Sequence, residues 1–174
     1  MKSMSIEKVV LVNEKDEVVG SMEKIEAHEK ALLHRAFSVF VINKNNELML
    51  QRRALEKYHS PGLWTNTCCS HPRVDETYES GAHRRLVEEM GFDCDLKDVF
   101  SFIYKAPFDN GLTEHELDHV FVGYCETEPV INPDEVASWK WIAMDKLKKD
   151  ILDNPNDYTV WFKIIFEKFA EHFD

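Results

Sequence analysis

The pattern of apolar and polar residues in the first third of the chain predicts two pairs of strands. Residues 9–12 and 18–19 are rich in valine and flank a polar turn, and residues 37–42 and 48–52 do the same. Short β-branched and aromatic runs on either side of a polar turn are typical of antiparallel hairpins. The segment 23–33 between the two pairs is polar and compatible with a helix.

The remainder of the chain predicts three more strands and three helices. We expect strands at 100–105, 117–124 and 139–142, and helices at 78–90, 144–152 and 157–173. Gly91 follows the first of these helices as a stop signal. The last helix carries an apolar stripe at helical spacing, formed by Trp161, Ile164, Ile165, Phe169 and Phe173. Together these elements predict a mixed α/β domain in which strands pair in hairpins and helices pack outside.

The composition favours a globular domain that does not bind nucleic acid or membranes. The chain has 174 residues, of which 44% are hydrophobic, and its 11 phenylalanines supply enough apolar mass for a core. Lys and Arg number 21 against 32 Asp and Glu, which gives a net charge of −11. Nonspecific binding to nucleic acid or to anionic membranes requires a basic surface, so we expect neither.

No segment predicts a membrane span or a signal peptide. The longest apolar runs, such as residues 37–42, fall far short of the ~20 residues that a transmembrane helix needs. Residues 1–12 lack a long apolar run and a small-residue cleavage site. The four cysteines show no disulfide pattern; they are Cys68, Cys69, Cys94 and Cys125. We therefore expect a cytoplasmic protein with free thiols.

Residue types that carry chemistry are concentrated in the irregular segment 54–74. In it or at its edge lie Arg53, Lys57, His59, Trp64, Asn66, Cys68, Cys69 and His71. Loops held between rigid elements commonly carry functional sites. This segment is therefore the first place where we expect a site.

A set of histidines and glutamates can supply the ligands of one divalent metal ion. The set is His28, His34, His71, Glu114 and Glu116. Imidazole and carboxylate together suit an ion such as Mn, Zn or Mg. Residues two apart in a strand point the same way, so both glutamates can reach one ion while His115 and His119 face away. Spacing alone also allows His28 to be a surface residue and both glutamates to be solvated.

The helix expected at 78–90 pairs basic with acidic side chains. Arg84 and Glu88 are four residues apart, as are Arg85 and Glu89, so each pair shares a helix face. One interpretation is two surface ion pairs, which contribute little stability. The other is that a carboxylate holds a metal ion beside a guanidinium that binds a phosphate oxygen.

This helix and the residues before it resemble the Nudix box of enzymes that process diphosphates. The matching pattern is Ser70-x5-Glu76-x7-Arg84-Arg85-Leu86-x-Glu88-Glu89-x-Gly91-Phe92. It departs from the box at two positions, because Ser70 replaces the first glycine and Arg85 replaces the glutamate of an Arg-Glu pair. The loss of an acid and the gain of a base suit holding a diphosphate rather than cutting it.

The chain as a whole resembles the type 1 isopentenyl-diphosphate isomerase family over nearly its full length. The matching segments are Ala27-His28, Leu33-His34-Arg35-Ala36-Phe37-Ser38, Gln51-Arg52-Arg53-Ala54, Pro61-Gly62-Leu63-Trp64-Thr65-Asn66, Cys69-Ser70-His71-Pro72, Arg84-Arg85-Leu86-x-Glu88-Glu89 and Glu114-His115-Glu116. The resemblance implies a Nudix-type α/β/α sandwich of the α+β class, with a mixed sheet and flanking helices. It also implies a single domain over 1–174, with an N-terminal extension 1–33, a core 34–145 and C-terminal helices 146–174.

The resemblance implies that the protein isomerises isopentenyl diphosphate to dimethylallyl diphosphate in isoprenoid biosynthesis. One proton is added to a carbon and another is removed two bonds away, through a carbocation-like intermediate. Cys69 would be the acid/base on one side of the substrate, and Glu116, hydrogen-bonded to Tyr104, on the other. The sequence leaves open which of the two groups delivers the proton and which removes one, and we favour delivery by the Glu116–Tyr104 pair and removal by Cys69. Cys68 would face away, since neighbours in an extended chain point to opposite sides.

The resemblance also implies substrate-binding residues. Four basic residues match positions that bind the diphosphate, namely Lys24, Arg53, Lys57 and Arg85. Trp161 matches an aromatic residue that faces the substrate carbons and stabilises a cation. The residues themselves leave three alternatives open. Lys24 can be a solvated surface lysine, Arg52 can turn inward in place of Arg53, and Trp161 can be a core residue.

The implied cofactors are two divalent ions. One Mn, Zn or Mg ion would occupy the histidine–glutamate site, and a second, Mg²⁺, would bind with the diphosphate through Glu89. The implied partner is the small-molecule substrate, bound by a monomer or homodimer. Two other functions remain open. A Nudix hydrolase of a nucleoside diphosphate derivative would share the fold, and a metal-stabilised binding module would need no acid/base residues.

Overall fold

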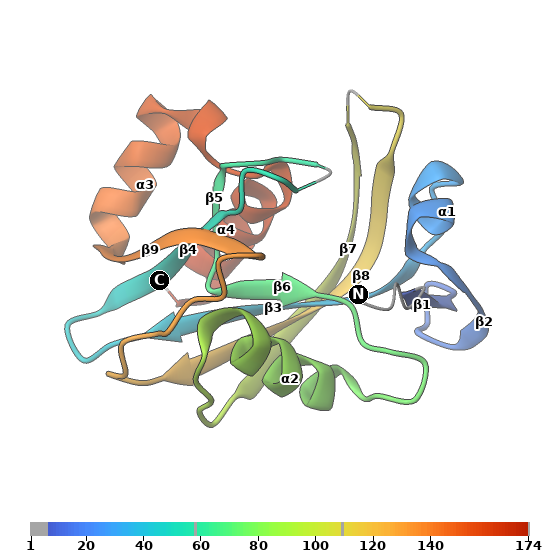
Figure 1. The fold of residues 1–174 in the computed structure, drawn as a ribbon, viewed down its shortest axis with the longest axis horizontal. Coiled ribbons are helices and arrows are strands. Elements are labelled where there is room, and N and C mark those ends of the chain that lie inside the picture. Colours follow the sequence, from blue (N-terminus) through green and yellow to red (C-terminus); the bar gives the residue numbers. More distant parts are fainter. Residues whose placement is uncertain (1–6, 58, 109, 174) are drawn as a thin grey trace.

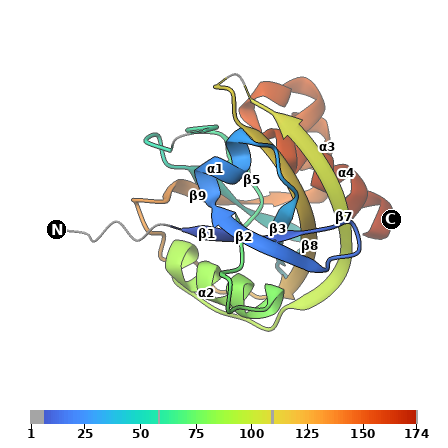
Figure 2. The ribbon, with the colours of Figure 1, turned by 90° about the vertical axis from the view of Figure 1, so that its right-hand side faces the viewer.

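The computed structural model describes residues 7–57, 59–108 and 110–173, except for the side chains of residues 172 and 173. The expected place of Phe173 in the apolar stripe therefore lies outside the described side chains. In the described part, the strands form one mixed sheet with helices on both faces (Figure 1 and Figure 2). None of the described helices is long and apolar enough to cross a membrane.

The helices and strands follow one another along the chain in a mixed order. The strands are β1 (Lys8–Val12), β2 (Val18–Glu23), β3 (His34–Ile42), β4 (Glu47–Arg53), β5 (Trp64–Thr65), β6 (Cys68–Ser70), β7 (Lys97–Pro107), β8 (Thr113–Tyr124) and β9 (Val136–Ala143). The helices are α1 (Lys24–Glu29), α2 (Tyr78–Met90), α3 (Met144–Asp153) and α4 (Val160–Phe173), with a 3₁₀ turn at Pro155–Asp157. Strand β3 lies at the centre, where it pairs in parallel with β8 and antiparallel with β1 and β6.

Strand β3 is buried on both faces because a helical layer covers each side of the sheet. Phe37, Val39 and Val41 pack in the apolar cluster that includes α2. Phe40 and Ile42 point to the other face and pack with α3 and α4. An almost continuous apolar run is typical of a strand covered on both sides. The period of two along β3 therefore divides the core into two halves.

Strands β3 and β4 separate after a single pair at Ile42 and Leu48. Beyond that pair, β4 joins β5 and β9, while β3 joins β6 and β8. The predicted hairpin of residues 37–42 and 48–52 is therefore closed only at its turn. A gap opens between its strands, and residues 64–70 run through it.

Side chains of residues 66 and 67 bond to both strands that border this gap. Thr67 Oγ1 accepts a hydrogen bond from the Val41 amide at 2.9 Å and donates one to the Met49 carbonyl at 2.6 Å. Asn66 Nδ2 donates to the Val39 carbonyl at 3.1 Å. Buried backbone groups need such partners, so these two side chains replace the missing strand-to-strand bonds.

Most predicted elements are confirmed, with bounds that move by a few residues. Helix α2 has the predicted bounds, and Thr77 caps its first turn by accepting a hydrogen bond from the Ser80 amide. Gly91 ends it with a left-handed φ of 70°, and a side chain there would collide with the Val130 carbonyl. The last helix begins at Val160 rather than at residue 157, because the chain is still extended where the Thr159 amide bonds to the Trp64 carbonyl.

Replacing Thr67 with valine keeps the shape of the side chain and removes the hydroxyl that bridges β3 and β4. We expect Thr67→Val to lower the free energy of unfolding by about 1–3 kcal/mol, because the buried Val41 amide and Met49 carbonyl lose their partner. Urea denaturation measures the change. The exposed Thr127 gives a matched control, since Thr127→Val should change stability by less than about 0.5 kcal/mol. Equal effects of the two substitutions would contradict the bridging role of Thr67.

Candidate active site

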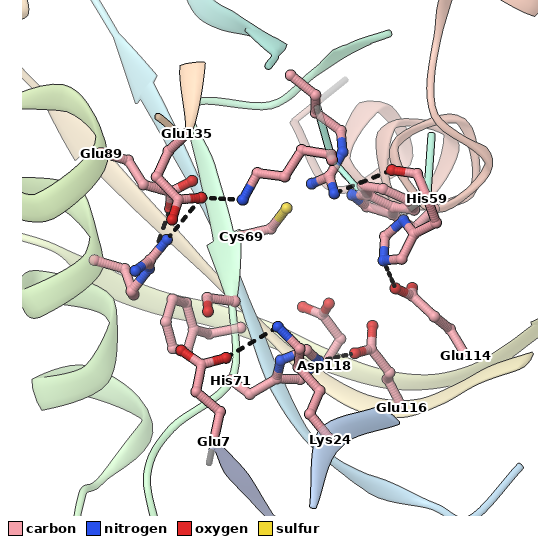
Figure 3. Close-up of a pocket in the computed structure, with 16 residues that line it drawn as sticks. Glu7, Lys24, His59, Cys69, His71, Glu89, Glu114, Glu116, Asp118 and Glu135 are labelled. Atoms are coloured by element: carbon pink, nitrogen blue, oxygen red, sulfur yellow. Dashed lines mark hydrogen bonds and ion pairs between the residues drawn. The ribbon is translucent and has the colours of Figure 1, made fainter. Parts of the chain in front are cut away.

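One pocket gathers most of the residues that the sequence singled out (Figure 3). Of those residues, the pocket is lined by Lys24, Arg53, Lys57, Cys69, His71, Arg85, Glu89, Glu114, Glu116 and Trp161. Three further predicted site residues, His28, His34 and Tyr104, are buried and contact these lining residues without lining the pocket themselves. The pocket therefore joins residues from both ends of the chain.

Three histidines and a glutamate meet at one end of this pocket. The ligand atoms of His28, His34, His71 and Glu116 all lie within 4.8 Å of one another. The parallel register sets His34 on β3 directly opposite Glu116 on β8. Glu116 Oε2 lies 2.6 Å from His71 Nε2 and 3.2 Å from His34 Nε2. Helix α1, strand β3, the segment after β6 and strand β8 thus each contribute one group.

The hydrogen bonding of His34 suits a cation between the ring and the glutamate. Its Nδ1 donates to the Leu32 carbonyl at 2.9 Å, and in the tautomer that carries its only proton there, Nε2 can offer its lone pair to a metal ion beside Glu116. Burial alone would raise the pKa of Glu116, but the imidazoles of His71 and His34 hold it well below its usual value. A lone pair and a carboxylate that face each other are stabilised by a shared metal ion.

His28 provides a second argument that the cluster fits a metal ion. Its side chain is fully buried, and within the described part of the chain neither ring nitrogen has a hydrogen-bond partner. Burial, followed by the nearby His71, lowers the pKa of His28 to about 3, so the ring stays neutral. A buried imidazole without partners is costly, and a bound metal ion would satisfy one of its nitrogens.

Glu114 lies beside this cluster but outside the group of four. Its carboxylate accepts a hydrogen bond from Tyr104 Oη at 2.8 Å and lies 3.4 Å from His59 Nε2. Tyr104 Oη also bonds to Glu116, which it faces across the β7–β8 register. Burial and then the charge of Glu116 raise the pKa of Glu114 well above its usual value. The two glutamates share one face of β8, as predicted, and a single phenol connects them.

The two adjacent cysteines of β6 face opposite sides of the strand. Cys69 lines the pocket, where its sulfur points into the open space (Figure 3). Burial raises the pKa of Cys69 to about 12, although Arg53 acts in the opposite direction. Cys68 is fully buried on the other side and donates a hydrogen bond to Glu89 Oε2 at 2.9 Å. The alternation of side chains in β6 thus selects Cys69 for the pocket and gives Cys68 a supporting contact.

Basic side chains also line the pocket, and three of them lie beside a carboxylate. Lys24 pairs with Glu7 at 2.9 Å, and Lys57 forms an ion pair with Glu135. Arg85 lies 3.5 Å from Glu89 and 3.4 Å from Glu135. Lys24 therefore takes part in the pocket rather than lying on the surface as a solvated lysine.

Arg53 rather than Arg52 turns inward. Arg53 is buried and lines the pocket, while Arg52 is exposed and donates to the Gly62 carbonyl. The guanidinium carbon of Arg53 lies 5.1 Å from the centre of the Trp161 ring. Trp161 packs in the core on the α4 side and also forms part of the pocket wall. It is therefore both a core residue and a residue that can face a ligand.

The two arginines of α2 differ in their surroundings. Arg84 bonds to Glu76 at 2.6 and 2.8 Å and is absent from the lining of this pocket. Its contact with Glu88 at 3.3 Å is the ion pair that the spacing suggested, whereas the bonds to Glu76 lie outside that prediction. Arg85 instead reaches the pocket and contacts Glu89.

Sequence reasoning assigned no site role to six residues that line the pocket, which are Glu7, Phe37, His59, Ser70, Asp118 and Glu135. Asp118 lies two residues beyond Glu116 on the same face of β8, so the alternation along the strand would have identified it. Glu135 sits in a loop before β9, where no pattern marks it. His59 was noted only as part of the crowded segment.

Comparisons with known proteins show which family the chain belongs to. Residues 32–162 match the NUDIX domain family. The chain is 56% identical over 157 residues to isopentenyl-diphosphate Delta-isomerase 2 of Photorhabdus laumondii, covering 90% of this chain and 89% of that protein. It is 50% identical over 162 residues to isopentenyl-diphosphate Delta-isomerase 2 of Aromatoleum aromaticum, covering 93% of this chain and 86% of that protein.

Solved structures share the fold at lower identity. A Deinococcus radiodurans protein superposes with a TM-score of 0.78 at 22% identity, covering 93% of this chain and 98% of that one. A MutT protein from Methanosarcina mazei gives 0.63 at 21% identity, covering 80% and 94%. The predicted Nudix fold, with its mixed sheet and flanking helices, is therefore confirmed. From the extent and identity of these matches, the chain belongs to the isopentenyl-diphosphate Delta-isomerase family of NUDIX-domain proteins.

Proposed function

We propose that this protein isomerises isopentenyl diphosphate to dimethylallyl diphosphate by adding a proton to one carbon and removing another two bonds away. The observation that carries the proposal is that Cys69 and Glu116 line the same pocket. A reaction that protonates one carbon and deprotonates another needs two acid/base groups around one substrate. The curated relatives bear the name of this reaction over about nine-tenths of the chain.

The protonation states of the pocket support acid/base chemistry from two sides. Burial raises the pKa of Cys69 to about 12 and that of Tyr104 well above its usual value, so both carry a proton at neutral pH. Glu116 is ionised beside Tyr104. A proton donor therefore stands on each side, and a proton acceptor adjoins the phenol. In these protonation states Cys69 can deliver the proton and Glu116 can accept one, which is the reverse of the order expected from the sequence.

The diphosphate is proposed to bind the four cations of the pocket, Lys24, Arg53, Lys57 and Arg85. Cationic donors hold phosphate oxygens through charge-assisted hydrogen bonds. The diphosphate would then stay attached while positive charge develops on the carbon chain. The face of Trp161, buried in the wall of the same pocket, would stabilise that charge.

The histidine cluster is proposed to hold one divalent ion, Mn, Zn or Mg, through His28, His34, His71 and Glu116, with Glu114 as a further ligand. When bound there, the ion supplies positive charge that fixes the buried carboxylate of Glu116. A second ion, Mg²⁺, is proposed to bind with the diphosphate at Glu89. The proposal also keeps the cytoplasm as the place of action and a monomer or homodimer as the active form.

Incubation with isopentenyl diphosphate in deuterated water tests the proposed function. An isomerase that exchanges protons with solvent should place deuterium in the dimethylallyl product, which mass spectrometry detects. A nucleoside diphosphate derivative serves as the competing substrate. Phosphate release from that compound, without deuterium incorporation into the prenyl product, would favour a Nudix hydrolase instead.

Substitution of the proposed acid/base groups should remove activity and leave the fold intact. We expect Cys69→Ala and Glu116→Gln each to lower kcat by at least about 10²–10⁴-fold, since each loses a positioned proton carrier. Cys68→Ala is the matched control, because its thiol points to the opposite side of β6. Steady-state kinetics and circular dichroism measure the two properties. Turnover of Cys69→Ala at the wild-type rate would exclude Cys69 from the chemistry.

Removal of the metal ion should also abolish the isomerase activity. We expect chelator-treated protein to lose activity and to recover it on addition of Mn²⁺, Zn²⁺ or Mg²⁺. His71→Ala should weaken binding of the ion by at least tenfold, as loss of even an outer partner typically costs 10–100-fold. His115→Ala should not, because His115 faces away and contacts the Ala31 carbonyl. Calorimetry measures both affinities, and full activity without any metal by elemental analysis would contradict the metal site.

A further inference from the structure

His59 is buried in the wall of the pocket, although Leu55 and Glu56 in the same loop are exposed. Its side chain is 7% exposed, whereas Leu55 is 69% exposed. The imidazole stacks on the Phe108 ring, with centroids 5.1 Å apart and planes at 7°. It meets Trp161 edge to face, at 5.4 Å and 87°. Two aromatic residues, Phe108 directly after β7 and Trp161 on α4, therefore fix the plane of this ring.

The backbone around His59 is also held in place. Arg53 Nη2 donates a hydrogen bond to the His59 carbonyl at 3.3 Å. Ser60, the next residue, has a φ of 49°, in the left-handed region that residues other than glycine adopt at a cost. Such strain persists only where the surrounding contacts maintain it, so this part of the loop has a defined position.

The fixed ring presents its Nε2 to Glu114. Figure 3 shows His59 above Glu114, and Nε2 lies 3.4 Å from Glu114 Oε1. The other carboxylate oxygen, Oε2, accepts the hydrogen bond from Tyr104 Oη at 2.8 Å. The carboxylate is thus held from two sides, by a phenol of the neighbouring strand and by an imidazole of a distant loop. Its orientation beside Glu116 depends on both contacts.

We propose that His59 is a positioning residue that holds the Glu114 carboxylate beside the histidine cluster and so strengthens divalent-cation binding there. The inference rests on the metal site of the proposed function and adds a residue that no sequence motif assigns. Outer partners that orient a carboxylate near a metal ion are commonly responsible for 10–100-fold in affinity or activity. His59 is connected to the cluster through Glu114, so its effect is expected to pass through that carboxylate.

Two substitutions of His59 separate the contact between Nε2 and Glu114 from the packing of the imidazole ring. His59→Phe keeps an aromatic ring between Phe108 and Trp161 but removes Nε2. His59→Gln loses the ring and keeps an N–H donor of similar reach toward Glu114. We expect His59→Phe to weaken Mn²⁺ binding 10–100-fold, measured by calorimetry on chelator-stripped protein without substrate. We expect His59→Gln to stay within about threefold of wild type, as a conservative rescue of the contact.

The controls make each outcome decisive. His83→Phe alters an imidazole of α2 that contacts Asp93 and should leave Mn²⁺ affinity unchanged. In a Glu114→Ala background, His59→Phe should cause no further loss of Mn²⁺ affinity, because the carboxylate that His59 contacts is absent. Wild-type affinity in His59→Phe, or an additive loss in the double variant, overturns the proposal. Failure of the wild-type protein to isomerise its substrate while it still binds Mn²⁺ would instead overturn the proposed function.

Discussion

The hydrogen bonds that fill the gap between β3 and β4 determine where everything else in the pocket can lie. Two strands that separate inside a core leave amides and carbonyls that must find other partners. Thr67 and Asn66 supply those partners from side chains. The chain can therefore pass through the sheet at this point without leaving buried polar groups unpaired. Strand β6 then carries Cys69 into the pocket, and His71 follows directly after the last residue of that strand.

Strand register then brings the metal and acid/base groups together. The parallel pairing of β3 with β8 sets His34 opposite Glu116, and the antiparallel pairing of β7 with β8 sets Tyr104 opposite the same glutamate. A shift of one residue in either pairing would turn Glu116 to the other face of the sheet. The rigidity of the central sheet therefore defines the positions of these side chains, and helix α1 adds His28 from outside it.

Local signals in the sequence were enough for the long elements and for the residues in motifs. Helix α2 was predicted with its bounds because Gly91 marks its end, and Cys69 was separated from Cys68 by simple alternation. Strands β5 and β6 were missed since two or three residues are too few to show a period, and Pro61 interrupts the segment before them.

Contacts between distant segments account for what the sequence did not reveal. Glu135 approaches Lys57 and Arg85 only after β9 has paired with β4, so no local pattern announces it. His59 owes its place to Phe108 and Trp161, which lie about fifty and one hundred residues further along the chain. The roles of such residues can be recognised only from the folded structure.

The pairing of pocket lysines and arginines with the protein's own carboxylates affects which ligands can enter. Because Glu7 and Glu135 already neutralise these cations, an incoming anion must exchange places with a carboxylate instead of meeting bare positive charge. A polyanion that binds together with a divalent cation meets both needs. The polyanion can pair with the lysines and arginines, and the cation can bind the carboxylates that the polyanion displaces. A lone monoanion leaves them unmatched in a low-dielectric cleft. On the proposed function, these ion pairs would favour a metal-chelated polyanion over a simple monoanion.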